Sequence, residues 1–237
     1  MKILALDSSG LVASVAVVED EKLLAEYTVN YKKTHSQTLL PMLDEIGKMI
    51  DLDLSTIDAI AVAAGPGSFT GLRIGSATAK GLGLALDKPL IAVPTVDALA
   101  YNLYGTDKLV CPIMDARRNQ VYTGLYRFRR ELETVKEQTP MDMGELIGEL
   151  NARGERVIFL GDGVPVYRAM IEEKMTAEYD FAPPHVNRQR AASVAALGAV
   201  YFAEGKIETA AEHKPDYLRK SQAEREREEK EREGNLH

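Results

Sequence analysis

The feature that most constrains the fold is an order of structural elements that occurs twice along the chain. Three strand-like runs, a helical run, a buried strand and a second helix follow one another in residues 1–86, and the same order returns from residue 109. Strands are predicted from β-branched and apolar runs bounded by turn residues, and helices from apolar residues three and four apart. Alternating strands and helices in two like halves predict an α/β protein of duplicated βββαβα halves, with a cleft between them.

The predicted elements also suggest where the chain divides. In the first half, strands are expected at residues 2–7, 11–19, 23–29, 57–65 and 89–94, with helices from residue 36 and from 70 to 86. In the second half, strands are expected at residues 109–116, 120–128, 131–139 and 156–163, with helices at 141–154 and 164–175. We therefore predict a first domain at residues 1–103, a second at 104–218 and a charged tail at 219–237.

A glycine-rich segment, "IAVAAGPGSFTGLRIGSATAKGLGLAL" at residues 60–86, joins an apolar strand to a helix. It fits neither a dinucleotide-binding pattern, which needs glycine in place of Thr70, nor a P-loop, which needs lysine in place of Leu72. The helix instead carries small residues at four-residue spacing, Gly71, Gly75, Ala79 and Gly83. Each helical glycine costs about 1 kcal/mol relative to alanine. The small-residue ridge therefore predicts a closely packed helix of this chain or of another subunit.

Two acidic strand ends are the candidate chemical groups. Asp7 ends the first strand before a turn of small polar residues, where a carboxylate can hold a metal-bound phosphate or accept hydrogen bonds from turn N–H groups. Asp115, Arg117 and Arg118 lie at a hairpin turn of the second half, where they either face the cleft or form a turn salt bridge. Ser68 lacks the G-x-S-x-G frame and the histidines are scattered, so no nucleophile or metal-ligand set is predicted.

Composition excludes several classes of protein. Lysine plus arginine number 29 against 36 acidic residues, a net charge of −7 that argues against a primary nucleic-acid binder. The basic stretches at residues 127–130 and 187–190 are expected to be solvated faces. Cys111 is the single cysteine, expected to be a packed core thiol, so no disulfide can form within the chain. The chain begins with a strand and contains no long apolar run, which predicts a soluble, cytoplasmic protein without a membrane span.

Four segments together resemble the bacterial TsaB (YeaZ) family: "KILALDSS" at residues 2–9, "AAGPGSFTGLRIGSATAKGLG" at 63–83, "PTVDALA" at 94–100 and "MDARRNQVY" at 114–122. The resemblance implies the two-domain fold shared by actin, Hsp70 and sugar kinases, in agreement with the duplicated halves. That family is similar in turn to TsaD, the transferase that attaches a threonylcarbamoyl group to adenosine beside the anticodon of tRNAs that read codons beginning with A.

The same resemblance implies that the catalytic groups of TsaD are missing here. Where TsaD carries a His-x-x-x-His metal pair, this chain has Thr95 and Leu99, which are not ligands for a transition metal. Asp162, in "LGDGV", places a carboxylate where TsaD-like proteins have a glycine-rich nucleotide loop. We therefore expect no catalytic residue, no metal and no cofactor of the chain's own, and a vestigial nucleotide cleft marked by Asp7, Asp115, Arg117 and Asp162.

By this resemblance the chain is a non-catalytic scaffold and activating subunit. It is expected to pair with TsaD through the helices of its first domain, and with itself in isolation, while the ATPase TsaE joins the assembled pair. ATP and metal are expected on the partner subunits, and tRNA is met only through the complex. The expected interface residues are Leu39, Leu43, Ile46, Gly71, Gly75, Ala79 and Gly83. The alternative is an ATP-dependent phosphotransferase of the actin-like superfamily, using Asp7 and Asp115 around a magnesium nucleotide; a protease would lack its nucleophile and base.

Overall fold

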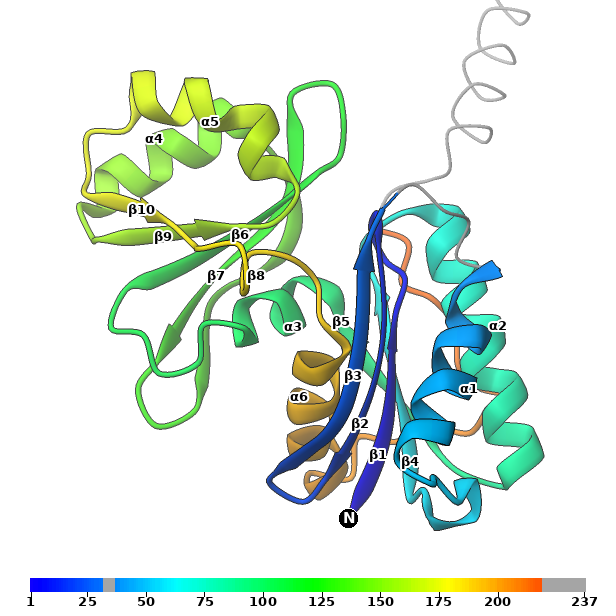
Figure 1. Cartoon of the computed structure of the whole chain (residues 1–237). Helices are drawn as coiled ribbons and strands as arrows, with labels where there is room; N and C mark the ends of the chain where they lie inside the picture. Colours follow the sequence, from blue (N-terminus) through cyan, green and yellow to red (C-terminus); the bar gives the residue numbers. More distant parts are fainter. Residues whose placement is uncertain (32–36, 219–237) are drawn as a thin grey trace, which may run out of the picture.

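The computed structural model describes residues 1–31 and 37–218, so the predicted charged tail lies outside the described residues. Two five-stranded mixed sheets form the framework (Figure 1). The first has the order β3-β2-β1-β4-β5 and the second the order β10-β9-β6-β7-β8. Read from the opposite edge, the second sheet repeats the first strand for strand. The predicted α/β fold of two like halves is therefore confirmed.

The first half places three antiparallel strands before its parallel ones. β1 pairs antiparallel with β2 and parallel with β4, and β4 pairs parallel with β5. All seven residues of β4 are buried, as expected for a parallel strand covered on both faces. The elements are β1 (Lys2–Asp7), β2 (Val12–Glu19), β3 (Lys22–Asn30), α1 (Leu39–Met49), the short 3-10 helix η2 (Leu54–Thr56), β4 (Ala59–Gly65), α2 (Phe69–Leu86), β5 (Leu90–Pro94) and α3 (Thr95–Tyr101).

The second half repeats this order. The caps of its first helix follow from the sequence, because Asp142 accepts hydrogen bonds from two amides of the first turn and Gly154 ends the helix in the left-handed conformation. The elements are β6 (Leu109–Asp115), β7 (Gln120–Phe128), β8 (Leu132–Asp142), α4 (Met143–Arg153), β9 (Val157–Leu160), α5 (Gly163–Lys174), β10 (Tyr179–Phe181) and α6 (Ala191–Ala203). Each half thus has one more strand and one more helix than the βββαβα unit. Of these four elements only β5 corresponds to an expected one, the strand at residues 89–94.

The additional helices, α3 and α6, are exchanged between the halves. α3 follows the last strand of the first sheet, yet Val96, Leu99 and Ala100 pack in a core cluster with residues of the second sheet. α6 follows the last strand of the second sheet, yet Val194 and Leu197 pack on the first. Both helices therefore lie between the two sheets (Figure 1). We call the first sheet with α1, α2 and α6 the first lobe, and the second sheet with α3, α4 and α5 the second lobe.

The exchange bears on the predicted division into domains. The division at residues 1–103 and 104–218 stays a prediction, but α6 and the segment after it contact the first sheet rather than the second. Glu208 forms an isolated antiparallel bridge with Leu90 at the edge of the first sheet, and the Asp216 amide donates to the Ala64 carbonyl at 2.7 Å. Residues within 191–218 thus contact the first sheet, although the predicted division assigns them to the second unit. Within the described residues, no helix is long and apolar enough to cross a membrane.

Candidate partner interface and polar residues of the two lobes

The small-residue ridge of α2 packs inside its own chain. A Cβ atom at Gly71 would lie 2.0 Å from the Ser8 carbonyl oxygen, and one at Gly75 would lie 2.5 Å from the Ser8 hydroxyl oxygen. Ala79 is fully buried, and a Cβ at Gly83 would lie 2.9 Å from a methyl group of Leu90. The prediction that these four positions meet another subunit is therefore wrong. At residues 71 and 75 glycine is needed, because the helix backbone rests directly on Ser8 in the turn that follows β1.

The three predicted interface residues of α1 are core residues as well. Leu39, Leu43 and Ile46 are 1%, 7% and 3% exposed, and they belong to the core cluster between α1 and the first sheet. Their spacing of four and three residues places them on the one face of α1 that packs against the sheet. These three residues are therefore also corrected from partner contacts to core contacts, and any interface on this helix must use other side chains.

The faces of α1 and α2 that point away from the sheet carry exposed apolar side chains. The two helices lie on the same side of the first sheet and contact each other (Figure 1). Leu84 of α2 is 71% exposed and Leu40 of α1 is 55% exposed. In the turns before Leu84, α2 presents Ala77 and Gly81, exposed small residues that permit another helix to approach closely. We call this set the outer helix face; it comprises Leu40, Asp44, Lys48, Arg73, Ala77, Gly81 and Leu84.

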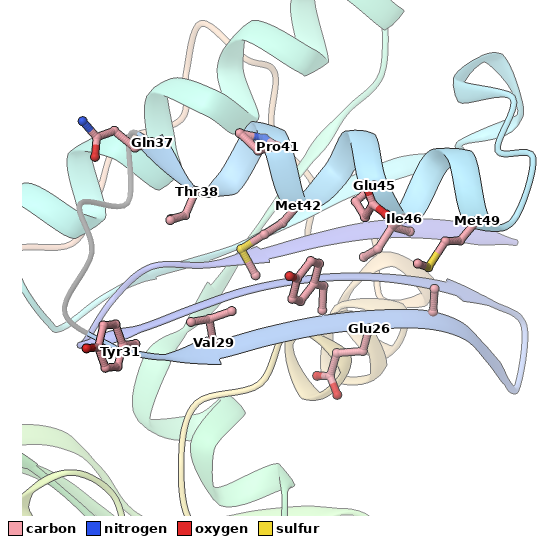
Figure 2. A pocket seen from close by; sticks show the side chains of 12 residues that line it. Glu26, Val29, Tyr31, Gln37, Thr38, Pro41, Met42, Glu45, Ile46 and Met49 are labelled. Carbon is pink, nitrogen blue, oxygen red and sulfur yellow. The ribbon is translucent and has the colours of Figure 1, made fainter.

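A groove of about 870 Å³ separates α1 from the edge strand β3 (Figure 2). Its walls are mainly apolar, with Met42, Ile46 and Met49 from α1 facing Val29 and Tyr27 from β3. Glu26 belongs to the lining but forms an ion pair with Arg190 of the segment before α6. The groove therefore adds apolar surface beside the outer helix face. It is lined by Ala25, Glu26, Tyr27, Val29, Tyr31, Gln37, Thr38, Pro41, Met42, Glu45, Ile46 and Met49.

Asp7 shapes the turn after β1. Its side chain is 1% exposed, and Oδ1 accepts hydrogen bonds from the Ser9 amide at 2.9 Å and the Ser9 hydroxyl at 2.7 Å. The glycine-rich segment closes over the same turn, because the Ser68 amide donates to the Ser9 carbonyl at 2.6 Å. Of the two roles that the sequence left open for Asp7, the geometry supports the hydrogen-bonded turn.

Asp115, Arg117 and Asp162 lie together in the second lobe, whereas Asp7 lies on the first sheet. Asp162 accepts a hydrogen bond from the Asp115 amide at 3.1 Å, and Asp115 accepts from the Arg117 amide at 2.9 Å and from the Tyr167 hydroxyl at 3.2 Å. Burial raises the pKa of the Asp162 carboxyl above its ordinary value. The three acidic and basic residues thus brace the turn between β6 and β7.

The turn itself has an uncommon backbone. Arg117, Arg118 and Asn119 have φ values of 62°, 54° and 61°, a left-handed run that side chains other than glycine adopt at a cost. The Asn119 side chain donates to Asp142 at 2.9 Å, and the Asn119 backbone carbonyl accepts from the Met143 amide at 3.0 Å. The sequence predicted a hairpin turn here but gave no sign of this conformation, because neither arginine is a left-handed residue by preference.

The positions that the resemblance compared with a metal pair are both buried. Thr95 accepts a hydrogen bond from the Gly65 amide at 3.1 Å, and Leu99 packs in the core of the second lobe. Between them Asp97, which the sequence did not single out, accepts a hydrogen bond from Tyr126 at 2.6 Å. Burial raises the pKa of the Asp97 carboxyl. Thr95 therefore bonds across to the first lobe, whereas the bond between Asp97 and Tyr126 lies within the second lobe.

The remaining candidates are structural. Arg127 forms ion pairs with Glu155 and Glu133, so the first basic stretch is balanced by acidic side chains. Cys111 is fully buried beside Thr123, and burial raises the pKa of its thiol to about 12, which confirms the prediction of a packed core thiol.

Comparison with known proteins links these features to one family. The family model of TsaD, described as tRNA N6-adenosine threonylcarbamoyltransferase, matches residues 22–227. A Bacillus subtilis protein named "tRNA threonylcarbamoyladenosine biosynthesis protein TsaB" is 35% identical over 94% of this chain and 96% of its own length. The protein of the same name from Haemophilus influenzae is 32% identical over 92% of this chain and 94% of its own length. Among solved structures, YeaZ from Pseudomonas aeruginosa superposes with a TM-score of 0.77 at 27% identity, covering 92% of this chain and 99% of that one.

Proposed function

Since the chain belongs to the TsaB family of tRNA threonylcarbamoyladenosine biosynthesis proteins, we propose that it acts in that synthesis as a non-catalytic subunit that holds and activates a TsaD-like transferase. The family relationship favours this role over the phosphotransferase alternative. In the proposed complex, a TsaE-like ATPase joins the assembled pair, and ATP and metal bind on the partner subunits. The tRNA is met through the complex, in the cytoplasm, and the chain pairs with itself when no transferase is present.

The way that the chain uses its polar residues supports a role without catalysis. Asp7 is turned inward and bonds to Ser9, and Asp115 and Asp162 are bonded to backbone amides of one turn. A carboxylate that is to hold a magnesium nucleotide needs free oxygen atoms directed at a common point. Asp7 and Asp115 instead accept hydrogen bonds that stabilise turns on different sheets, which supports a structural role for both.

The outer helix face is the observation that carries the proposal. Side chains such as Leu84 and Leu40 expose apolar surface on two adjacent helices that already use their other faces in the core. Burial of exposed apolar area on association stabilises a complex, and residues at the centre of such a patch dominate the binding free energy. The ion pair between Asp44 and Lys48, with a separation of 2.5 Å, places charge at one margin of the face. We propose this face as the site of pairing with the transferase and of self-association.

The test replaces Leu84 with glutamate and measures association with a purified TsaD by sedimentation. Association is expected to weaken about tenfold or more, which corresponds to about 1.4 kcal/mol. The melting temperature of the chain alone is expected to stay unchanged, because Leu84 is already exposed. Val166→Glu is the matched control, since Val166 is 57% exposed on α5 of the other lobe. Formation of threonylcarbamoyladenosine in tRNA by the mixed subunits should fall with Leu84→Glu and persist with Val166→Glu; equal loss with both variants would reject the assigned face.

A further inference from the structure

The segment between β10 and α6 crosses from one lobe to the other, and its first residues are fixed to the second lobe. The Gly161 amide donates to the Asn187 carbonyl at 3.0 Å. In return, the Arg188 guanidinium donates to the Gly161 carbonyl at 2.8 Å. Both bonds hold the segment against the turn between β9 and α5, so residues 187 and 188 move with the second lobe.

The residues immediately after this point are fixed to the first lobe. Arg190 forms an ion pair with Glu26 of β3. The Ala191 amide donates to the Ser14 hydroxyl oxygen at 2.9 Å, and the Ala192 amide donates to Glu26 at 3.1 Å. These contacts attach the start of α6 to the antiparallel side of the first sheet. The Arg190 guanidinium also donates to the His185 carbonyl at 3.4 Å, and the Asn102 side chain bonds both to the Arg188 carbonyl at 2.6 Å and to the Ser193 hydroxyl at 2.5 Å. The change of attachment from one lobe to the other therefore extends over residues 185–193 and includes Gln189.

The Gln189 side chain is buried, and its amide forms no hydrogen bond among the described residues. Its side chain is 1% exposed, and neither its amide nitrogen nor its amide oxygen has a hydrogen-bond partner among the described residues. The side chain presses against the turn between β1 and β2, where a Cβ atom at Gly10 would lie 2.9 Å from the Gln189 Nε2 atom. A buried primary amide that has lost its water and gained no partner opposes the arrangement that buries it.

From these contacts we infer that Gln189 biases a hinge between the lobes toward opening, because its unpartnered amide destabilises the arrangement in which it is buried. The arrangement described here buries the unpartnered amide, whereas rotation of the lobes apart about residues 187–190 returns the amide to water. The contacts of Arg188 with Gly161 and of Arg190 with Glu26 stay intact during that rotation, because each lies within one lobe. The hydrogen bonds of Arg190 with His185 and of Ser193 with Asn102 cross the segment and hold the closed arrangement. The other contacts between the lobes thus hold the closed arrangement, whereas the buried Gln189 amide favours opening. A partner that binds only one of the two arrangements shifts the population toward it. This inference does not depend on the proposed function.

A second glutamine between the lobes provides the matched control. Gln138 of β8 receives a hydrogen bond from the Val96 amide at 3.4 Å and donates one to the Gly65 carbonyl at 3.3 Å. Its amide therefore joins the second sheet to the glycine-rich segment of the first lobe. Methionine has nearly the length of glutamine without the polar amide. Replacement by methionine removes the unpartnered group at residue 189 but removes existing hydrogen bonds at residue 138.

The experiment measures stability and the separation of the lobes in the same variants. Spin labels on Glu21→Cys of the first lobe and Glu173→Cys of the second report the distance between lobes by pulsed electron resonance; both positions are exposed, and Cys111 is fully buried. Gln189→Met is expected to raise the melting temperature by about 4 °C or more and at least to halve the population at the longer distance. Gln138→Met is expected to lower the melting temperature and increase that population.

Each other outcome overturns the inference. A lower melting temperature for Gln189→Met would show that the amide has partners in solution. A higher melting temperature with an unchanged distance distribution would show that the amide is a local packing defect and no part of a hinge. If Gln189→Met fails to fold, Gln189→Leu replaces it, with the same two readings and the same expected directions.

Discussion

The Tyr126 hydroxyl donates a hydrogen bond of 2.6 Å to the Asp97 carboxylate, and the bond joins a central strand of the second sheet to the helix that enters from the first half. Tyr201 of α6 donates to the other oxygen of the same carboxylate at 3.4 Å. One buried acidic side chain therefore contacts elements of both lobes.

The first prediction concerns the pH dependence that Asp97 introduces. Burial raises the pKa of its carboxyl above the ordinary value of 3.8, although hydrogen bonds from Tyr126 and Tyr201 act in the opposite direction. A pKa that is higher in the folded state than in the unfolded state stabilises the fold fully below the unfolded value, and that contribution is lost as pH rises through the folded value. Asp97→Asn should therefore gain stability relative to the native chain as pH rises from about 4 toward neutrality. Urea unfolding at several pH values measures this difference, and a constant difference would contradict the assignment.

The second prediction separates the two kinds of glycine in α2. Gly75→Ala places a methyl group against the Ser8 side chain, and Gly71→Ala places one against the Ser8 carbonyl. Overpacking of this kind costs about 1–3 kcal/mol. Gly81→Ala is the matched control, because a Cβ at Gly81 meets nothing within 4 Å, and it should gain up to about 1 kcal/mol from helix propensity. Urea unfolding of the chain alone gives all three values; equal effects at Gly75 and Gly81 would contradict the close packing.

The third prediction uses Cys111 as a reporter of global unfolding. The thiol is fully buried and its pKa is raised to about 12, so the reactive thiolate is scarce at pH 8. Alkylation by iodoacetamide should proceed at the rate at which the chain opens, and it should accelerate with denaturant in parallel with unfolding. Rapid labelling in native buffer would show that the core of the second lobe opens locally.

The fourth prediction concerns Asp7 as a structural residue. Asp7→Ala removes the acceptor of the Ser9 amide and hydroxyl, and loss of a buried acceptor lowers stability by about 1–3 kcal/mol. ATP hydrolysis by the purified chain should remain at background in both proteins. Asp107→Ala, at an exposed position, should change stability by less than about 0.5 kcal/mol. Turnover by the native chain that disappears with Asp7→Ala would support the phosphotransferase alternative.

Most of the order of strands and helices could be predicted from the sequence, because the buried residues of a strand and of a helix recur with different periods. The predicted helix at residues 70–86 is observed as Phe69–Leu86, and the predicted strand at 57–65 as Ala59–Gly65. The exchange of α3 and α6 was not predictable in the same way. Periodicity shows that Val96 and Leu99 face something apolar, but the identity of the facing sheet depends on contacts between residues far apart in sequence.

The same limit explains the errors in the candidate interface. A ridge such as Gly71 and Gly75 indicates a close neighbour but does not distinguish the chain's own turn from another subunit. The proposed interface rests instead on Leu84 and Leu40, which are apolar residues outside the buried face of each helix. An apolar residue on the solvent side of an amphipathic helix requires a reason beyond the core.

The exchange of α3 and α6 also sets the order in which the protein can be completed during synthesis. One face of the first sheet is covered by α6, which ends at residue 203, so that face stays open until nearly the whole chain has left the ribosome. The first half cannot fold ahead of the second as a closed unit, in contrast to the usual sequential folding of domains from the N-terminus. A nascent chain stalled before residue 191 would lack the helix that packs on Ala61, Ile91 and Val93, and exposed apolar surface of this kind favours aggregation of a partly folded chain.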